Sequence, residues 1–235
     1  MEKIYLNTIY LATEGEGVNI GRPQVFIRYQ GCAVGCVNCD SMETWPFTED
    51  RSHTIDDILQ KVESLTLNAK IKWVSITGGD PLHPKHTPGL LKLVAALKEK
   101  KYMINLEAAG TRVVGEIFDL VDYISFDIKT PSTKVETPFT LLIKCVQQYS
   151  HKMQIKAVVS DRFDFDYFLT RKQALEAEVG EHSVPMVMTP AYNLGSAFPR
   201  ENFIELMKLN ESAGAPFRFI GQQHKWFFGP DATDV

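Results

Sequence analysis

The segment "QVFIRYQGCAVGCVNCDS", residues 24–41, decides the fold because it joins a strand pattern to a loop rich in cysteine. Its first six residues are mainly β-branched or aromatic, as in a buried strand. The loop that follows places Cys32, Cys36 and Cys39 close together and continues into Asp40. In α/β folds the functional loops follow the carboxyl ends of parallel strands, so this arrangement favours that class.

Similar short apolar runs recur along the rest of the chain, and helical patterns separate them. Residues 54–65 begin with a Thr cap and carry apolar residues at helical spacing. Residues 88–100 have Pro in the first turn and Lys in the last, and 200–210 repeat the helical pattern. The runs that we expect to form strands are 24–29, 73–77, 102–107, 123–127, 154–159, 184–189 and 217–221.

Strands that alternate with helices form a parallel sheet whose two faces are both buried. The strand starts from residue 73 onward are roughly 20 to 30 residues apart, which is the size of one βα unit. We therefore predict one α/β domain over 1–235, an incomplete (β/α) barrel of about six units. Residues 4–12 are expected to add an extra N-terminal strand beside the first. A doubly wound open sheet is the alternative.

The composition suits a soluble globular enzyme or binding protein. Of the 235 residues, 44% are hydrophobic and 23% are charged, and the formal net charge is −4, so we expect no nucleic-acid or membrane partner. Residues 1–17 lack the pattern of a signal peptide, and no apolar run approaches the roughly 20 residues that span a bilayer. We expect a cytoplasmic protein, in which cysteines are free thiols or metal ligands.

Three thiols this close together are typical of zinc or iron–sulfur sites. A structural zinc takes four ligands, but the fourth cysteine, Cys145, lies in an expected amphipathic helix and is predicted to be a buried apolar residue. His53 is the other candidate for a fourth zinc ligand. A [4Fe–4S] cluster held by three cysteines explains the count better, because it leaves one iron open for a second molecule.

The Cys-x3-Cys-x2-Cys spacing resembles the signature of the radical S-adenosylmethionine (SAM) superfamily. Residues 76–82, "ITGGDPL", resemble its Gly-Gly-Glu-Pro motif, with Asp80 at the position of Glu. The resemblance implies a partial barrel in which SAM binds the open iron. It also implies that an electron from the cluster breaks SAM to give a 5′-deoxyadenosyl radical.

The flanking residues narrow the resemblance to one family. Residues 12–32, "ATEGEGVNIGRPQVFIRYQGC", resemble the 7-carboxy-7-deazaguanine synthases, with Glu14 where that family usually has Gln. Weaker resemblances follow at 39–45, 106–111, 126–132 and 222–230. The family resemblance implies a lyase that converts 6-carboxy-5,6,7,8-tetrahydropterin to 7-carboxy-7-deazaguanine with loss of ammonia, in queuosine-type biosynthesis. The implied cofactors are a [4Fe–4S] cluster, SAM and Mg²⁺.

The family pattern assigns residues to three groups. The cluster ligands implied are Cys32, Cys36 and Cys39. Ser41 is implied to help coordinate Mg²⁺, and a turn cap is its alternative role. The implied substrate residues are Thr13, Glu14, Gly15, Glu16, Arg28, Thr77, His224 and Lys225. The implied SAM residues are Asn38, Cys39, Asp40, Gly78, Gly79, Asp80, Asp127, Ile128, Lys129, Thr189, Pro190, Ala191 and Tyr192.

Individual residues have chemistry that suits these roles. Arg28 can pair with the substrate carboxylate through two parallel hydrogen bonds. His224 and Lys225 are expected at the end of the last strand, within a C-terminal segment of about 217–235 on the substrate side. Residues 231–235 extend beyond the point where some family members end, and Asp127 stands where the family usually has Ser. No side chain stands out as a general base.

Two other functions remain open on the sequence. One is a radical SAM activase that acts on a protein partner, and the other is a non-catalytic zinc-binding module. The acidic turn at 14–17 favours a small-molecule site over the activase. The family resemblance further implies a homodimer and an electron donor such as a flavodoxin.

Overall fold

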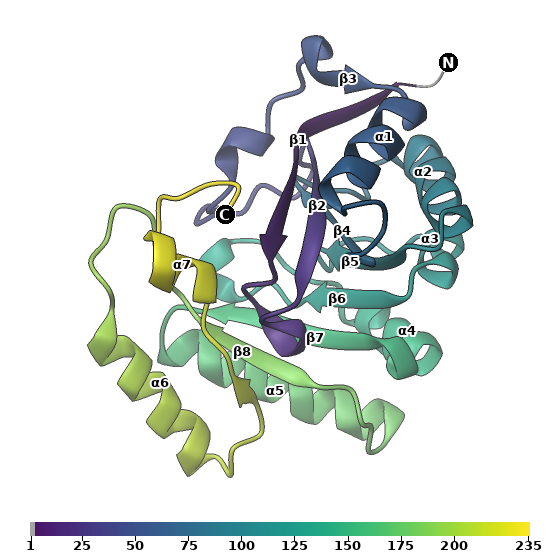
Figure 1. The fold of residues 1–235 in the computed structure, drawn as a ribbon. Coiled ribbons are helices and arrows are strands. Elements are labelled where there is room, and N and C mark those ends of the chain that lie inside the picture. Colours follow the sequence, from purple (N-terminus) through teal and green to yellow (C-terminus); the bar gives the residue numbers. More distant parts are fainter. Residues whose placement is uncertain (1–2) are drawn as a thin grey trace.

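Nine strands in residues 3–235, the part of the chain that the computed structural model describes, form one sheet (Figure 1). Its order is β3-β1-β2-β4-β5-β6-β7-β8-β9. The strands are β1 Ile4–Thr13, β2 Pro23–Tyr29, β3 Ser52–His53, β4 Trp73–Gly78, β5 Met103–Ala108, β6 Tyr123–Asp127, β7 Met153–Val159, β8 Met186–Pro190 and β9 Arg218–Phe219.

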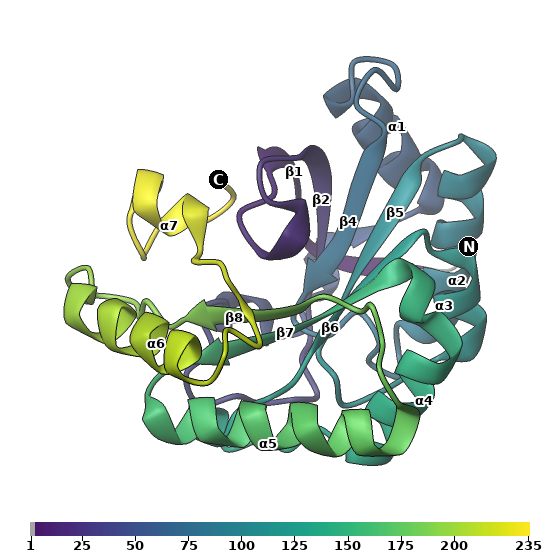
Figure 2. The ribbon, with the colours of Figure 1, turned by 90° about the horizontal axis from the view of Figure 1, so that it is seen from below.

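The sheet is parallel from β2 to β9, whereas β1 pairs antiparallel with both β2 and β3. It curves strongly but does not close, because β3 and β9 remain at its two edges (Figure 2). The predicted incomplete barrel with an extra N-terminal strand is therefore confirmed. The curvature directs the carboxyl ends of the parallel strands toward one shared space.

Helices α1 to α6 cover the outside of the curved sheet, whereas the short α7 lies on its inner side (Figures 1 and 2). Thr54 begins α1 through a capping box with Asp57, which satisfies free N–H groups of the first turn. Pro88 stands in the first turn of α2, where no N–H is needed. The helices are α1 Ile55–Leu65, α2 Thr87–Glu99, α3 Gly115–Leu120, α4 Phe139–Tyr149, α5 Arg162–Val179, α6 Arg200–Ser212 and α7 Gln223–Phe228.

The hydrophobic core lies between the sheet and these outer helices. Alternate strand residues such as Ile76, Leu106 and Phe126 point into it and are fully buried. Cys145 on α4 is also buried there as a free thiol, as the sequence predicted for it. In the described residues, no helix is both long and apolar enough to cross a membrane.

The inner face of the sheet is polar instead. Asn105 donates to Ser75 Oγ at 2.9 Å and accepts from Ser125 at 3.3 Å, and Gln154 donates to Ser125 at 2.8 Å. Gln154 also accepts from the backbone N–H of Val18 at 2.8 Å. This ladder of hydrogen bonds fixes the short turn after β1 above the sheet, at the floor of the site.

The end of the chain differs from the sequence prediction. His224 and Lys225 were expected at the end of the last strand, but β9 stops at Phe219 and both residues lie in α7. The reason is tertiary: the Trp226 ring packs so closely on Gly221 that no Cβ fits there, and Gln223 N donates to Gly15 O at 2.8 Å. These contacts turn the chain out of the sheet and across the inner space.

Candidate active site

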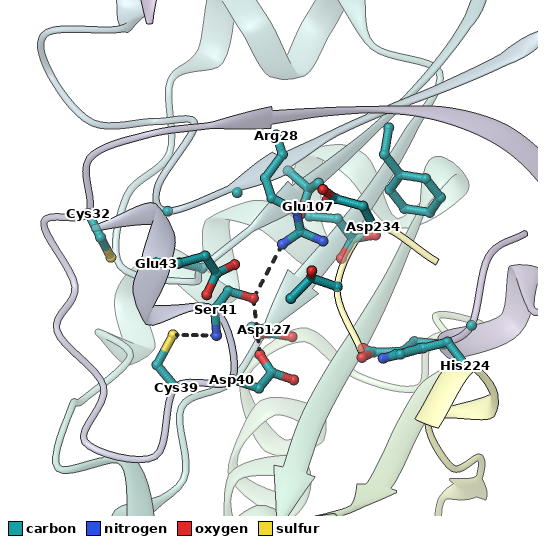
Figure 3. A pocket seen from close by; sticks show the side chains of 18 of the residues that line it. Arg28, Cys32, Cys39, Asp40, Ser41, Glu43, Glu107, Asp127, His224 and Asp234 are labelled. Carbon is teal, nitrogen blue, oxygen red and sulfur yellow. Dashed lines mark hydrogen bonds and ion pairs between the residues drawn. The ribbon is translucent and has the colours of Figure 1, made fainter. Parts of the chain in front are cut away.

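A cavity of about 260 Å³ opens at the carboxyl ends of β2, β4, β5, β6 and β7. The cysteine loop, the turn after β1, α7 and the end of the chain enclose it (Figure 3). All eight residues that the sequence assigned to substrate binding line this cavity, namely Thr13, Glu14, Gly15, Glu16, Arg28, Thr77, His224 and Lys225.

Cys32, Cys36 and Cys39 line one end of the cavity as half-buried free thiols. Backbone N–H groups point at two of the sulfurs: Val34 N lies 3.4 Å from Cys32 Sγ, and Ser41 N lies 3.4 Å from Cys39 Sγ. Burial raises the pKa of Cys36 and Cys39 above the ordinary thiol value. Coordination by metal would reverse that shift, because a metal binds the thiolate.

This donor set fits a [4Fe–4S] cluster. Three soft sulfur ligands face one cavity, and N–H donors of the kind that tune iron–sulfur clusters surround them. Among residues 3–235, no three His, Cys, Asp or Glu side chains converge on a single metal ion. A cluster asks for a different arrangement, since each thiolate binds a separate iron. His53 lies in β3, outside the residues that line the cavity.

Close packing against the second strand end fixes the cysteine loop. Asp80 N donates to Gly31 O at 2.9 Å, and Gly31 N donates to Thr44 O at 2.6 Å. A Cβ at Gly79 would collide with the carbonyl of Gly31, so only glycine permits this approach. The "GGDP" segment therefore supports the loop through backbone contacts.

Arg28 lies deep on the opposite side of the cavity from α7. Its Nη2 donates to Tyr10 Oη at 2.8 Å, and its Nη1 donates to Ser41 Oγ at 3.2 Å. Nε is buried and has no hydrogen-bond partner in the described residues, and Asp234 Oδ1 lies 4.0 Å from it. The guanidinium is thus held in place while its buried Nε–H has no hydrogen-bond partner among the described residues, as an anion-binding group would be.

Glu14 is buried, and protein groups already engage both of its oxygens. Oε1 accepts from Glu16 N at 3.1 Å, and Oε2 accepts from Gln24 Nε2 at 2.7 Å. Burial, followed by repulsion from Glu107, raises its pKa to about 7. A carboxyl group that is protonated near neutral pH resembles the neutral amide that the family usually has at this position.

The sequence analysis missed Lys156 and Glu107. Lys156 Nζ lies 2.9 Å from Glu107 Oε2 and 3.1 Å from Glu16 Oε2, and all three residues line the cavity. A charged residue between apolar neighbours in the predicted strand 154–159 was the available signal. Glu107 lay within the segment 106–111 that was noted only as a family motif.

A second cavity of about 490 Å³ adjoins the first, between the cysteine loop and the ends of β6, β7 and β8. Asn38, Ile128, Ala191 and Tyr192 line it, as expected of residues that bind SAM. The two cavities share Glu16, Cys36, Cys39, Asp40, Asp127, Lys129 and Lys225. Its volume is within the range of small-molecule sites.

The remaining residues assigned to SAM are distributed differently. Gly78 and Gly79 line the first cavity only. Asp80 is buried outside both cavities, where its Oδ1 accepts from Leu82 N at 3.0 Å. Thr189 and Pro190 are buried in β8 and line neither cavity. Like the roles of the other assigned site residues, the SAM-binding role of these three stays a prediction.

Two ion pairs connect the cavities. Lys225 on α7 is buried, pairs with Asp40 at 2.8 Å and donates to Tyr192 O at 3.0 Å. Lys129 pairs with Asp127 at 2.8 Å. Figure 3 shows Asp127 and Asp40, which line both cavities, beside the cysteine loop. A buried lysine and a half-buried lysine thus anchor the acidic side chains at the boundary between the expected substrate and SAM sites.

The comparisons with known proteins agree with this arrangement. Residues 13–117 match a family model described as a 4Fe-4S single cluster domain. The chain is 30% identical over 159 residues to 7-carboxy-7-deazaguanine synthase of Pyrobaculum aerophilum, covering 67% of this chain and 68% of that protein. It is 31% identical over 172 residues to the synthase of Bacillus cereus, covering 71% and 70%.

The chain belongs to the 7-carboxy-7-deazaguanine synthase family of radical SAM enzymes. A further 7-carboxy-7-deazaguanine synthase, from Koribacter versatilis, is 29% identical over 241 residues and extends the likeness to 98% of this chain and 99% of that protein. As a member of a radical SAM family, the protein is an enzyme that uses an iron–sulfur cluster and SAM.

Solved structures support the 7-carboxy-7-deazaguanine synthase fold. The crystal structure of QueE from Escherichia coli matches 94% of this chain and 95% of that chain with a TM-score of 0.70 at 20% identity. Streptococcus suis SuiB bound to S-adenosylmethionine matches 83% of this chain and 48% of that chain with a TM-score of 0.52 at 14% identity. These likenesses concern the fold alone.

The end of the chain also lines the first cavity. Pro230, Ala232, Thr233, Asp234 and Val235 line the cavity beside the thiols and Arg28 (Figure 3). The segment of about 217–235 was expected on the substrate side, and residues 231–235 extend beyond the end of some synthases, but the sequence did not predict a contact between Asp234 and Arg28. The contact between Asp234 and Arg28 joins residues that are far apart in the sequence.

Proposed function

We propose that this protein converts 6-carboxy-5,6,7,8-tetrahydropterin to 7-carboxy-7-deazaguanine with loss of ammonia. The observation that carries the proposal is the polarity of the first cavity. Arg28 offers an anion-binding group on one wall, and the carboxylates of Glu16 and Glu107 lie together elsewhere in the same cavity. The substrate has a carboxylate and a guanidine-like edge, so it carries the complementary groups.

Within this proposal, Cys32, Cys36 and Cys39 hold the cluster, and the second cavity holds SAM. Bound there, SAM would supply a 5′-deoxyadenosyl radical for hydrogen abstraction from the pterin, once the reduced cluster had donated the electron that splits SAM into methionine and this radical. The protein residues bind and orient the substrate so that C6 faces the boundary between the two cavities. The end of the chain and α7 line the cavity, and in this proposal they limit the access of water to the bound substrate.

The proposal includes a Mg²⁺ ion bound near Ser41. Ser41 Oγ accepts from Arg28 Nη1 at 3.2 Å and lies 3.3 Å from Asp40 Oδ1. A hydroxyl oxygen has a second lone pair, so it can take part in an oxygen ligand set together with the substrate carboxylate. Mg²⁺ would stabilise negative charge on that carboxylate during the rearrangement.

Cellular context completes the proposal. We propose a cytoplasmic enzyme that acts as a homodimer and receives electrons from a flavodoxin-type donor. Support comes from the family resemblance and from a net charge of −4, which gives no attraction to nucleic acid or to anionic membranes.

The test is product analysis after anaerobic reconstitution with iron and sulfide. The enzyme is supplied with SAM, a reductant, Mg²⁺ and 6-carboxytetrahydropterin, and 7-carboxy-7-deazaguanine and ammonia are measured. We expect equal amounts of both products. Deoxyadenosine formation without turnover of the pterin would contradict the proposal and favour a different substrate, such as a partner protein. One zinc per chain and no sulfide would instead favour a metal-binding module.

A further inference from the structure

Lys156 is a buried cation that faces the expected substrate site. It lies in β7, and its side chain is only 8% exposed. Its Nζ donates to Glu16 at 3.1 Å and to Glu107 at 2.9 Å. The three residues come from β7, from the turn after β1 and from β5, so the fold brings them together from distant parts of the sequence.

The other oxygen of each carboxylate is also fixed. Gln222 Nε2 donates to Glu16 Oε1 at 2.8 Å, and Asn105 Nδ2 donates to Glu107 Oε1 at 2.7 Å. Each carboxylate oxygen can accept more than one hydrogen bond, so lone pairs remain for a ligand in the cavity. Both carboxylates are therefore held in one orientation before any substrate arrives.

Lys156 supplies a positive charge that lies between the two carboxylates. Two carboxylates that share a buried site repel each other, and without a cation one of them takes up a proton. Burial alone would raise the pKa of Glu16, but Lys156 and then His224 bring it well below its ordinary range. Glu14 and Asp127 are the other acidic groups that act on the Lys156 ammonium.

A structural ion pair is the competing explanation, and the position of the triad argues against it. All three residues line the cavity rather than the core behind the sheet. A buried ion pair seldom stabilises a fold more than apolar residues of similar size would. The triad is thus better placed to recognise a ligand than to support the barrel.

We propose that Lys156 is a positioning residue: it holds Glu16 and Glu107 as a pair of hydrogen-bond acceptors that read the N–H donors of the 2-amino-pyrimidinone edge of the substrate. The inference rests on the proposed function for the identity of that substrate. A ring with a carbonyl in place of the amino group would direct an acceptor at the carboxylates and be rejected. Lys156 therefore acts on specificity through the two glutamates and does not touch the reacting atoms.

The experiment compares two unreactive, fluorescent ligands, 6-carboxypterin and 6-carboxylumazine, which differ in an amino group against a carbonyl at ring position 2. Their dissociation constants are measured on the anaerobically reconstituted enzyme with SAM. We expect the wild-type enzyme to bind the pterin at least about tenfold more tightly than the lumazine. Lys156→Met should lower this ratio about tenfold or more, mainly by weakening the pterin.

Two further variants separate the charge of Lys156 from general effects on folding. Lys156→Arg retains the charge and should restore most of the ratio, even if Lys156→Met folds poorly. Lys98→Met removes a paired lysine outside both cavities, one that contacts Asp122 at 2.6 Å, and should leave the ratio unchanged. Equal weakening of both ligands in Lys156→Met, or no preference for the pterin in the wild-type enzyme, would overturn the inference.

The two proposals fail separately in this design. Neither ligand is turned over, so selective binding of carboxypterin without conversion of the tetrahydropterin would refute the proposed function and leave the role of Lys156 intact. Normal conversion with an unchanged ratio in Lys156→Met would refute only the role of Lys156.

Discussion

Asp234 Oδ1 lies 4.0 Å from Arg28 Nε, so the end of the chain brings a carboxylate to the guanidinium proposed to bind the carboxylate of the substrate. The two residues stand more than two hundred positions apart in the sequence. Nε has no hydrogen-bond partner among the described residues, and the Asp234 side chain is 42% exposed. A weak internal ion pair therefore occupies the position of a stronger expected contact.

Removing the Asp234 carboxylate should strengthen substrate binding. In Asp234→Asn, the charge that competes for Arg28 is absent, and KM should fall by about two- to fivefold, the range of a partly exposed ion pair. Steady-state kinetics with varied pterin concentration measure the effect. Asp231→Asn is the matched control, because Asp231 accepts from Gly195 N and does not line the cavity. A rise in KM for Asp234→Asn would indicate that the tail supports binding instead.

Even a conservative substitution of Arg28 should lower the activity. Arg28→Lys keeps the charge but cannot contact Tyr10, Ser41 and a substrate carboxylate together, because an ammonium group lacks the planar fork of guanidinium. We expect kcat/KM to fall by about 10- to 100-fold, equivalent to one charged hydrogen bond. The control is Arg171→Lys, whose partner Glu136 is exposed and lies outside both cavities. Similar small losses in both variants would contradict the role.

The raised pKa of Glu14 predicts a pH-dependent stability. An unpaired Glu titrates near its ordinary value, whereas folded Glu14 has a pKa of about 7. Folding therefore favours the protonated form, and the stabilisation is lost as pH rises from about 4.5 to 7. Glu14→Gln cannot ionise, so its stability relative to wild type should increase by up to about 3 kcal/mol between pH 5 and pH 8.

Urea unfolding of both proteins at the two pH values measures this change. Glu116→Gln is the control, because that residue lies in the first turn of α3, away from the cavity. A difference between Glu14→Gln and wild type that is the same at pH 5 and pH 8 would show that Glu14 stays ionised in the folded protein.

The cysteine loop predicts a selective loss of the cluster. Cys36→Ala should remove one of three thiolates, so iron and sulfide content and the visible absorption of the cluster should fall, together with reductive cleavage of SAM. Cys145→Ala should keep all three, because Cys145 is buried on α4 away from both cavities. Full cluster content in Cys36→Ala would exclude that thiol as a ligand.

Much of the fold follows from local pattern, because period and capping are properties of neighbouring residues. The strand 123–127 and the helix start at Thr54 were predicted at the positions where the structure has them. The cysteine spacing and the acidic turn 14–17 likewise indicated the site before its geometry was known. These signals depend on neighbouring residues, so the long-range contacts of the folded protein do not alter them.

The misses all depend on contacts between distant segments. The hydrogen bond from Gln223 N to Gly15 O holds the chain outside the sheet, so the last strand ends early. Lys156 reaches Glu16 and Glu107 only because the fold brings β5, β7 and the turn after β1 together. No periodicity encodes such contacts, because they arise from strand order and curvature.

The hydrogen bond from Gln223 to Gly15 carries a consequence for synthesis of the protein. The cysteines leave the ribosome early, but the wall that α7 contributes arrives only after roughly 190 more residues, or about 10 to 40 seconds at ordinary translation rates. During that interval the thiols have no enclosing cavity. Stable acquisition of an oxygen-sensitive cluster is therefore expected to follow translation of α7.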